Sequence, residues 1–256
     1  MNIKAEQKQK VTLPSPLFRD PITTAQPIRR SSGMKKKNSV PALHPAPCHG
    51  CSDRCVLGAW NSLGVATSRD GTKWLYRGTL EGLDIEPGHN TFWAPEIIEA
   101  EGLYHMYVSY ITGIPNDWEY PRWMLHYTST NLWDWRFEGR VDLDSERVID
   151  ACVYEIAPHT YKMWYKDEDK ESRTYAAVSY DLYHWDAVGE EVADCGQEGP
   201  NVFELGGKIW MISDFWNGLA VIHRKIIRTG HGVRIFYGNP AQERWTPEWD
   251  ITRMFS

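Results

Sequence analysis

Three acidic residues recur through the middle of the chain, each at the entrance to an apolar run. They are Glu96 at the end of a W-A-P-E segment, Asp150 at the start of a D-A-C segment, and Glu198 at the start of an E-G-P-N segment. The acids lie roughly 50 residues apart, which is long enough for one supersecondary unit per acid. Proline and glycine fix the backbone beside two of them. Carboxylates that converge in this way support general acid and base catalysis, in which one is protonated and another is ionised.

The segments that follow the acids repeat as well. A second Glu comes a few residues after each acid, at positions 99, 155 and 204, and the next apolar run contains Met106, Met163 or Met211. A pattern S-x-D-x-x-x-W occurs at residues 68–74 and 179–185, and at 129–135 with Asn131 in place of Asp. An Asp or Asn in a tight turn accepts hydrogen bonds from its own backbone, and the Trp can then start the next strand and pack under the turn.

These repeats indicate the architecture. A period near 50 residues with about four short strands in each period is typical of a β-propeller. No window shows a sustained helical period, so we expect an all-β protein with little helix. The innermost strands of a propeller face one axis, and acids at equivalent positions of successive blades would then surround a single pocket. The alternative is that Glu96, Asp150 and Glu198 are turn-forming acids at the corners of the blades.

The amino-acid composition favours some classes of protein and argues against others. The chain has 256 residues, 13% of them aromatic, with 13 Trp and 13 Tyr. Such a content is usual in proteins that stack sugar rings or pack aromatic-rich sheets. The net charge of −6 argues against a nucleic-acid partner, and no run is long and apolar enough for a membrane span. The first residues lack the apolar core of a signal peptide, so we expect a cytoplasmic protein, and the five cysteines predict no disulfide framework.

The three acidic segments resemble motifs of glycoside hydrolase family 43 and its five-bladed propeller relatives, families 32 and 117. The similarity covers about residues 63–221. It implies a glycosidase that hydrolyses an oligo- or polysaccharide with inversion at the anomeric carbon. Such enzymes have three carboxylates in a central funnel. By this resemblance Glu198 is the general acid, and Asp150 orients it and tunes its pKa. Trp93 would shape a sugar subsite in the second blade.

Other residues near these motifs are candidates for substrate binding. The aromatic candidates for sugar platforms are Trp93, Trp118, Trp164 and Trp216, and core packing is the alternative for each. The polar candidates are Glu96, His89 and Lys166. We expect no required cofactor and no metal at the site, and nothing in the sequence indicates a structural calcium ion. Cys152 and Cys195 are interpreted as buried small residues rather than nucleophiles.

The family pattern also requires a base Asp in a D-P segment of the first blade, and here the chain departs from it. Asp20-Pro21 is the only such dipeptide and lies ahead of any clear strand. Residues 19–59 contain no Phe, Trp or Tyr, and arginines and lysines cluster between residues 29 and 37. Three interpretations are a basic disordered arm, a loop insertion, and a zinc site at the C-x-x-C-x-x-x-C of Cys48, Cys51 and Cys55.

A shift of reading frame explains more of this stretch. DNA that encodes residues 23–33 can read D-G-A-A-D-P-T-I-I-R after a two-base shift, which would supply the missing D-P strand. A shift within residues 223–230 can read S-E-D-H-P-D-W, a further copy of the turn repeat. We therefore expect one propeller domain over residues 1–256, with well-matched blades at 63–221. Residues 24–62 and 222–256 are then frameshifted or disordered, the first and last blades are incomplete, and this form of the enzyme is inactive.

Two other functions stay open at the level of the sequence. A non-catalytic carbohydrate-binding propeller would keep the aromatic residues and tolerate the loss of acids. A glycoside phosphorylase would need a phosphate site, to which Lys166 and His89 are the candidate contributors, although Lys166 can instead pair with neighbouring acids.

Overall fold

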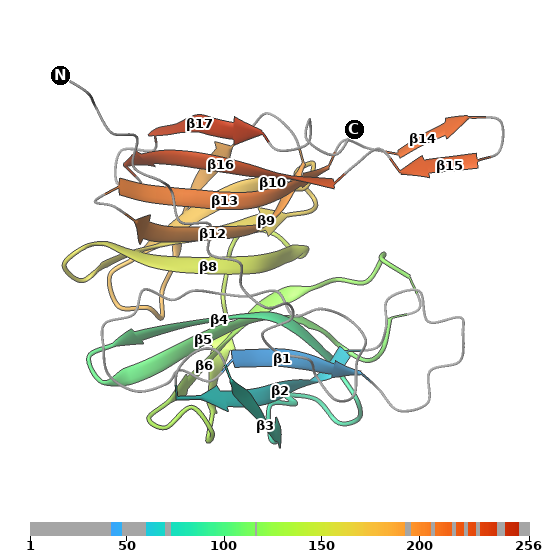
Figure 1. Cartoon of the computed structure of the whole chain (residues 1–256). Helices are drawn as coiled ribbons and strands as arrows, with labels where there is room; N and C mark the ends of the chain where they lie inside the picture. Colours follow the sequence, from blue (N-terminus) through green and yellow to red (C-terminus); the bar gives the residue numbers. More distant parts are fainter. Residues whose placement is uncertain are drawn as a thin grey trace.

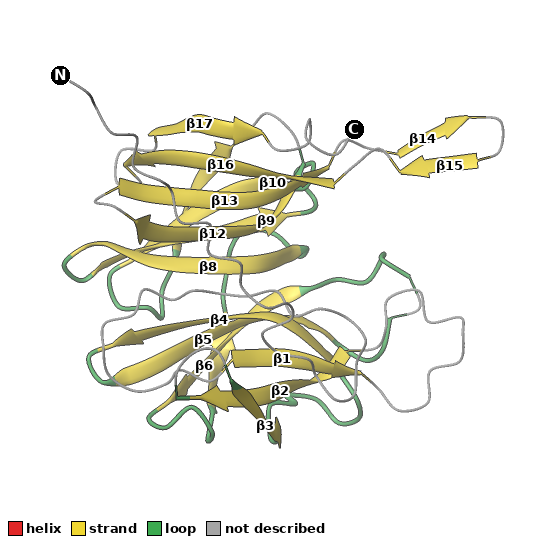
Figure 2. Cartoon of the chain, viewed as in Figure 1, coloured by secondary structure: helices red, strands yellow, loops and turns green. Residues whose placement is uncertain are grey.

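The computed structural model describes residues 42–47, 60–69, 73–115, 117–192, 196–205, 208–216, 219–222, 225–228, 231–239 and 244–250. Side chains are described for residues 62–69, 73–115, 117–192, 196–204 and 208–213. Every regular element in these ranges is a β-strand (Figure 2), which confirms the predicted all-β class. The search for helices able to cross a bilayer finds none in this part of the chain.

Two four-stranded antiparallel meanders form the middle of the described structure. One consists of β4 (Thr91–Ala100), β5 (Leu103–Ile111), β6 (Trp123–Ser129) and β7 (Arg136–Arg140). The next consists of β8 (Val148–Ala157), β9 (Thr160–Asp167), β10 (Arg173–Ser179) and β11 (Asp186–Val192). Each strand pairs with the next one along the chain, as expected for consecutive propeller blades.

The sheets before and after these meanders are less regular. The earlier sheet has three strands, β1 (Ala42–Pro47), β2 (Trp60–Ser68) and β3 (Trp74–Thr79). The later sheet has the order β12 (Gln197–Leu205), β13 (Lys208–Trp216), β16 (His231–Asn239) and β17 (Arg244–Asp250). A separate hairpin of β14 (Leu219–Ile222) and β15 (Lys225–Arg228) lies between β13 and β16 in the sequence and projects away from the sheets in Figure 1.

The first strands of successive sheets lie close to one another. β4 contacts β8, and β8 contacts β12, as Figure 1 also shows for the middle of the molecule. The sheets are thus arranged around their first strands in a propeller-like manner. This arrangement brings the starts of β4, β8 and β12, where the three acidic segments lie, to one end of the structure.

The core consists of apolar layers between neighbouring sheets. Met106 packs with Leu63 and Leu125 in one layer, and Met163 packs with Tyr107 in the next. Met211 lies in a third layer beside Trp164. The repeated methionines noted in the sequence are therefore equivalent core residues, each on the second strand of its sheet.

The repeated S-x-D-x-x-x-W segments form the same turn twice. Asp181 Oδ1 accepts hydrogen bonds from the backbone nitrogens of Tyr183 and His184, each at 2.8 Å. Asn131 does the same for Trp133 and Asp134, at 2.8 and 2.9 Å. The tryptophans that end these segments directly precede β7 and β11, and Trp74 begins β3. The predicted Asx turn is confirmed, since a local side chain satisfies the backbone of its own turn.

Candidate active site

Each of the three innermost strands contains a β-bulge near its start. The register shifts lie between Trp93 and Glu96 in β4, between Ile149 and Cys152 in β8, and between Glu198 and Asn201 in β12. The first residue inside each bulge has a left-handed backbone: φ is 47° at Ala94, 59° at Asp150 and 60° at Gly199. A bulge bends its strand and redirects the side chains beside it. Ala94, Asp150 and Gly199 are therefore the equivalent residues of the three strands.

This equivalence corrects one expectation from the sequence. The three acids do not occupy one position of the repeat, because Asp150 lies at the bulge, Glu198 precedes it by one residue, and Glu96 follows it by two. A spacing of roughly 50 residues could not reveal an offset this small, since the lengths of the intervening turns differ. The carboxylates therefore have different directions and different partners.

Glu96 connects two neighbouring sheets. Its side chain is buried, and Oε1 accepts a hydrogen bond of 2.8 Å from the backbone nitrogen of Val153 in β8. Cys152 makes the corresponding contact one sheet further on, where its buried Sγ lies 3.2 Å from the backbone nitrogen of Val202. The expectation that Cys152 is a buried small residue is confirmed. The structure places Glu96 at the junction of β4 and β8.

Asp150 is held from both sides by neighbouring strands. Its backbone nitrogen donates a hydrogen bond of 3.1 Å to Ser109 Oγ on β5. Its Oδ2 accepts a hydrogen bond of 3.0 Å from the backbone nitrogen of Gly199. The left-handed φ of a non-glycine residue costs energy, so these contacts help to maintain an unfavourable backbone conformation. The Asp150 carboxylate is consequently fixed next to the residue that follows Glu198.

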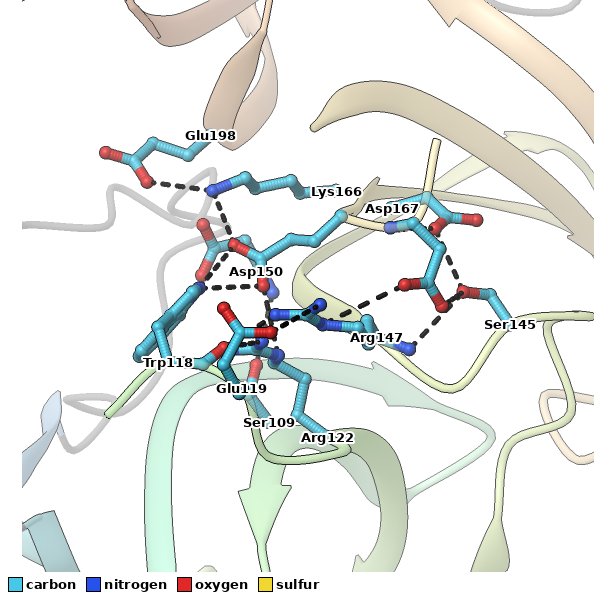
Figure 3. A network of polar contacts seen from close by, with 12 residues as sticks. Ser109, Trp118, Glu119, Arg122, Ser145, Arg147, Asp150, Lys166, Asp167 and Glu198 are labelled. Carbon is cyan, nitrogen blue, oxygen red and sulfur yellow. Dashed lines mark hydrogen bonds and ion pairs between the residues drawn. The ribbon is translucent and has the colours of Figure 1, made fainter. Parts of the chain in front are cut away.

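Glu198 is partly exposed, whereas Glu96 is buried. Its side chain is 31% exposed, and Oε2 lies 3.3 Å from the Nζ atom of Lys166 (Figure 3). The Lys166 side chain is buried and also contacts Glu168 Oε1 at 2.9 Å. The expectation that Lys166 pairs with neighbouring acids is confirmed. Lys166 therefore connects a buried carboxylate with an accessible one.

The charges around Lys166 determine its titration. Burial alone would lower the pKa of the Lys166 ammonium, but the nearby carboxylates of Glu168, Glu198 and Asp150 outweigh this effect and raise the pKa. The ammonium form is thus stabilised at the place where Asp150 and Glu198 come together. Lys166 stays a positive charge in this cluster over the physiological pH range.

Glu168 is a functional candidate that reasoning from the sequence missed. Besides Lys166, it binds Arg122, whose Nε lies 3.0 Å from Oε2, and Trp118, whose indole nitrogen lies 3.0 Å from both carboxylate oxygens. The Arg122 guanidinium also stacks on the Trp118 ring at 4.2 Å from its centroid. The available signal was the i, i+2 relation of Lys166 and Glu168, which places both side chains on one face of an extended chain.

Trp118 and Trp93 form an aromatic pair beside this network. Their ring centroids lie 6.0 Å apart with an interplanar angle of 58°. Trp118 is 37% exposed, and its backbone oxygen accepts hydrogen bonds from Arg122 and Arg147, each at 2.6 Å. Ring geometry that is fixed in this way suits the stacking of a planar or sugar ring.

The remaining sequence candidates lie elsewhere. Trp164 is completely buried in the layer that contains Met211, so its ring belongs to the core. His89 is exposed in the segment before β4, next to the buried Asn90. The side chain of Trp216 lies outside the described residues, as do Asp20, Cys195 and the C-x-x-C-x-x-x-C segment.

The site has the elements of acid–base chemistry on a ring-shaped substrate. The Asp150 carboxylate is bonded to the amide that follows Glu198. Lys166 contacts both Glu198 and the buried Glu168, and two tryptophans lie beside this network. Within the described residues no group of three or more His, Cys, Asp and Glu side chains is arranged to hold a metal ion.

The chain resembles known proteins in its fold. No protein-family model matches the chain, and no curated protein sequence does. Among solved structures the chain is similar to a family 32 β-fructofuranosidase of Bombyx mori, with 15% identity, a TM-score of 0.56 and coverage of 73% of this chain. It is similar to a family 43 endo-arabinanase of Bacillus licheniformis, with 14% identity, a TM-score of 0.59 and coverage of 86%. A further similar structure is an exo-β-1,3-galactanase of Phanerochaete chrysosporium, with 14% identity, a TM-score of 0.54 and coverage of 75%.

These similarities show that the fold resembles that of glycoside hydrolases of families 43 and 32. The chain spans 42% of the length of the β-fructofuranosidase, 44% of that of the galactanase and 75% of that of the endo-arabinanase. The expected resemblance to this propeller group is therefore confirmed for the fold.

Proposed function

We propose that this protein is a glycoside hydrolase that cleaves O-glycosidic bonds of an oligo- or polysaccharide by carboxylate acid–base catalysis with inversion. The observation that carries the proposal is the hydrogen bond of 3.0 Å between Asp150 Oδ2 and the amide of Gly199, which places a second carboxylate beside the accessible Glu198. The fold supports it, because similar folds belong to enzymes named for the cleavage of fructofuranosides, arabinan and β-1,3-galactan.

Each residue has a role in this proposal. Glu198 donates a proton to the leaving oxygen while the glycosidic bond breaks, and Asp150 orients Glu198. Trp93 and Trp118 bind the sugar ring. Glu168 contacts Lys166 at 2.9 Å, closer than the 3.3 Å of Glu198, so Glu168 can retain the ammonium when Glu198 takes up a proton.

We also propose that the chain lacks the catalytic base and that its first and last blades are incomplete. An inverting enzyme needs a base roughly 6.5–9.5 Å from the acid to activate water. In a five-bladed propeller with incomplete first and last blades, the first-blade D-P segment that would supply this base is missing from the written chain. Asp20 lies outside the described residues. We therefore propose that turnover with water is at background and that resequencing the gene restores the D-P segment.

Chemical rescue tests this mechanism with the chain as it exists. Azide is small enough to replace the activated water, so it can form a carbon–nitrogen bond at the anomeric carbon while the carbon–oxygen bond breaks. The leaving alcohol takes the proton of Glu198. We expect azide-dependent cleavage of arabinosides, fructosides or galactosides with alkyl leaving groups, and a glycosyl azide of inverted configuration. Glu198→Gln should reduce this cleavage by roughly 10²–10⁴-fold.

The controls separate the roles of the acid and the base. In aryl glycosides of an acidic phenol, the phenolate leaves without being protonated. Glu198→Gln should therefore impair the azide-dependent cleavage of these substrates far less. Equal activity of wild type and Glu198→Gln on every substrate would refute the role of Glu198. Turnover with water that survives Asp20→Ala would refute the need for a first-blade base.

A non-catalytic carbohydrate-binding propeller is the second candidate. The observation in its favour is the contact of 3.3 Å between Lys166 Nζ and Glu198, since an ion pair occupies the carboxyl group that would have to donate a proton. A binding protein would retain its ligand affinity in Glu198→Gln and show no rescued cleavage. A phosphorylase would instead show turnover that depends on phosphate. The pairing of Lys166 with two acids disfavours this function, because the ammonium group is not available to bind phosphate.

A further inference from the structure

A cavity of about 340 Å³ lies between the β4–β7 sheet and the β8–β11 sheet. It is bordered by the turns after β4, β8 and β10, whereas Asp150 and Glu198 lie near the starts of β8 and β12. The distance along β8 from Asp150 to Ala157 is roughly 23 Å at about 3.3 Å per residue. The cavity, named here the turn pocket, is therefore at the opposite end from the candidate active site. Its volume is at the small end of the range of ligand sites, roughly 300–1,000 Å³.

Aromatic rings form one side of the turn pocket. Tyr161 is buried at its base, while Tyr180 and Tyr183 are 68% and 39% exposed at its rim. The Tyr183 ring stands edge-on to the rings of His105 and His126, with centroids 5.4 and 5.1 Å apart. The direction of Tyr183 is thus fixed by buried neighbours. A fixed, partly exposed ring offers an apolar face to a ligand at low cost in conformational entropy.

Hydrogen-bonding groups line the turn pocket as well. Glu101 Oε1 lies 3.0 Å from His159 Nδ1, and Asp181 Oδ2 lies 2.7 Å from His184 Nδ1. Burial would raise the pKa of Asp181, but hydrogen bonds from the His184 side chain and from the turn backbone outweigh it and lower the pKa below its usual range. Both carboxylates already have a histidine partner. The pocket therefore suits a neutral ligand with several hydroxyl groups better than a cation.

We propose that the turn pocket is a second, non-catalytic binding site for one sugar unit of a neutral polysaccharide. The sugar ring stacks on Tyr183 and Tyr180, and its hydroxyl groups bond to Glu101, Asp181 and the exposed imidazole of His159. The choice of a sugar as ligand rests on the proposed glycosidase function. The site would hold a polysaccharide chain on the molecule independently of cleavage at Glu198.

Affinity electrophoresis of the full chain in native gels tests this site. The gels contain no additive or one soluble polysaccharide, namely arabinan, fructan or galactan. We expect at least one polysaccharide to retard the wild type, and Tyr180→Ala/Tyr183→Ala to raise the apparent Kd at least about fivefold. Trp133→Ala is the matched control, because Trp133 occupies the position of Tyr183 in the other Asx turn and does not line the pocket. Its retardation should equal that of the wild type.

The outcomes separate this site from the proposed active site. Retardation that persists in Glu198→Gln and is lost in the double tyrosine variant supports the turn pocket, whether or not azide-rescued cleavage occurs. Loss of cleavage in Glu198→Gln, together with loss of retardation in the double tyrosine variant alone, supports both sites. The turn pocket is refuted if no polysaccharide retards the wild type, if the double tyrosine variant is retarded equally, or if Glu198→Gln alone abolishes retardation. Equal melting temperatures of the variants exclude unfolding as the cause.

Discussion

Asp150 Oδ2 accepts a hydrogen bond of 3.0 Å from the backbone nitrogen of Gly199, so a carboxylate of β8 is attached to the bulge of β12. Gly199 directly follows Glu198, and both Asp150 and Gly199 have a left-handed φ. The contact thus joins the equivalent bulges of two neighbouring sheets. It sets the direction of Asp150 and the path of the backbone at Glu198 together.

Substitutions of Asp150 should separate its structural role from its charge. In Asp150→Asn the amide oxygen can still accept the bond from Gly199, and Asn tolerates a left-handed φ. We expect its free energy of unfolding to change by less than about 1 kcal/mol. Asp150→Ala loses the hydrogen bond to Gly199 but keeps the strained left-handed backbone. Its free energy of unfolding should fall by about 2 kcal/mol. Urea unfolding measures both values. Equal stability of the Asn and Ala variants would show that the bond to Gly199 contributes nothing.

Lys166 should make the stability of the protein depend on alkaline pH. Its folded-state pKa is raised above the ordinary value of 10.5, because Glu168, Glu198 and Asp150 outweigh the opposing effect of burial. The stabilisation is complete below pH 10.5 and is lost as the pH rises through the folded-state pKa. Lys166→Met should cost about 2–4 kcal/mol near pH 8, since Glu168 and Glu198 lose their shared cation. Urea unfolding between pH 8 and 11.5 should then show a shallower alkaline decline in the variant.

The comparison with Lys166→Arg serves as the control for this prediction. Arginine keeps the positive charge and does not titrate in this range. Its variant should retain more stability at pH 8 than Lys166→Met and show the same shallow decline. Tyrosines with a raised pKa, such as Tyr165, also lower the stability at alkaline pH. Their effect is the same in the wild type and in both Lys166 variants, so it cancels when the curves are subtracted. Parallel alkaline curves for wild type and Lys166→Met would contradict the assignment.

The parts of the fold that were predictable depend on local sequence. The Asx turns at Asn131 and Asp181 need only a side chain that bonds to the next few backbone nitrogens, so the S-x-D-x-x-x-W pattern identifies them. The buried methionines follow from apolar runs that repeat with the sheets. Together these features predict an all-β propeller-like fold from the sequence alone.

The candidate site was less predictable because it depends on contacts between sheets. The offset of Glu96 from Asp150 and Glu198 arises from bulges at Ala94, Asp150 and Gly199, and neither Ala nor Asp signals a left-handed backbone in the way that glycine does. Glu168 acquires its role from Arg122, which directly precedes β6 and is distant in sequence. Pairings of this kind cannot be obtained from the spacing of one repeat.

A second buried ion pair should be strongly coupled. Lys162 Nζ lies 2.9 Å from Glu191 Oε1, and both side chains are 2% exposed. Lys162→Met leaves a buried carboxylate without its ammonium and should destabilise by about 3–5 kcal/mol. Lys162→Met/Glu191→Leu should recover most of this loss, because no buried charge remains. A double-mutant cycle measured by urea unfolding gives the coupling energy between Lys162 and Glu191. Arg136→Met, which breaks the ion pair of an exposed side chain, is the control and should lower the free energy of unfolding by only about 0–1 kcal/mol. Additive effects of the two single substitutions would contradict it.

A buried histidine pair predicts the response of stability to acid. His105 Nδ1 lies 3.0 Å from His126 Nε2, and the rings stack with centroids 5.2 Å apart. Burial, together with the neighbouring His105, lowers the pKa of His126 from 6.5 to about 3. A depressed pKa means that the stabilisation is present above pH 6.5 and is lost as the pH falls towards 3.

Removal of this group should flatten the acid limb of the stability curve. We expect the free energy of unfolding of His126→Gln to decline less steeply between pH 6.5 and 4, by up to about 1.4 kcal/mol per pH unit, the slope for one proton. His184→Gln is the control, because the Asp181 carboxylate raises the pKa of this exposed histidine and its contribution has the opposite sign. Urea unfolding at half-unit intervals of pH distinguishes the variants. If His126→Gln and the wild type decline in parallel, the buried pair is protonated in the folded state and the assignment of neutral rings is wrong.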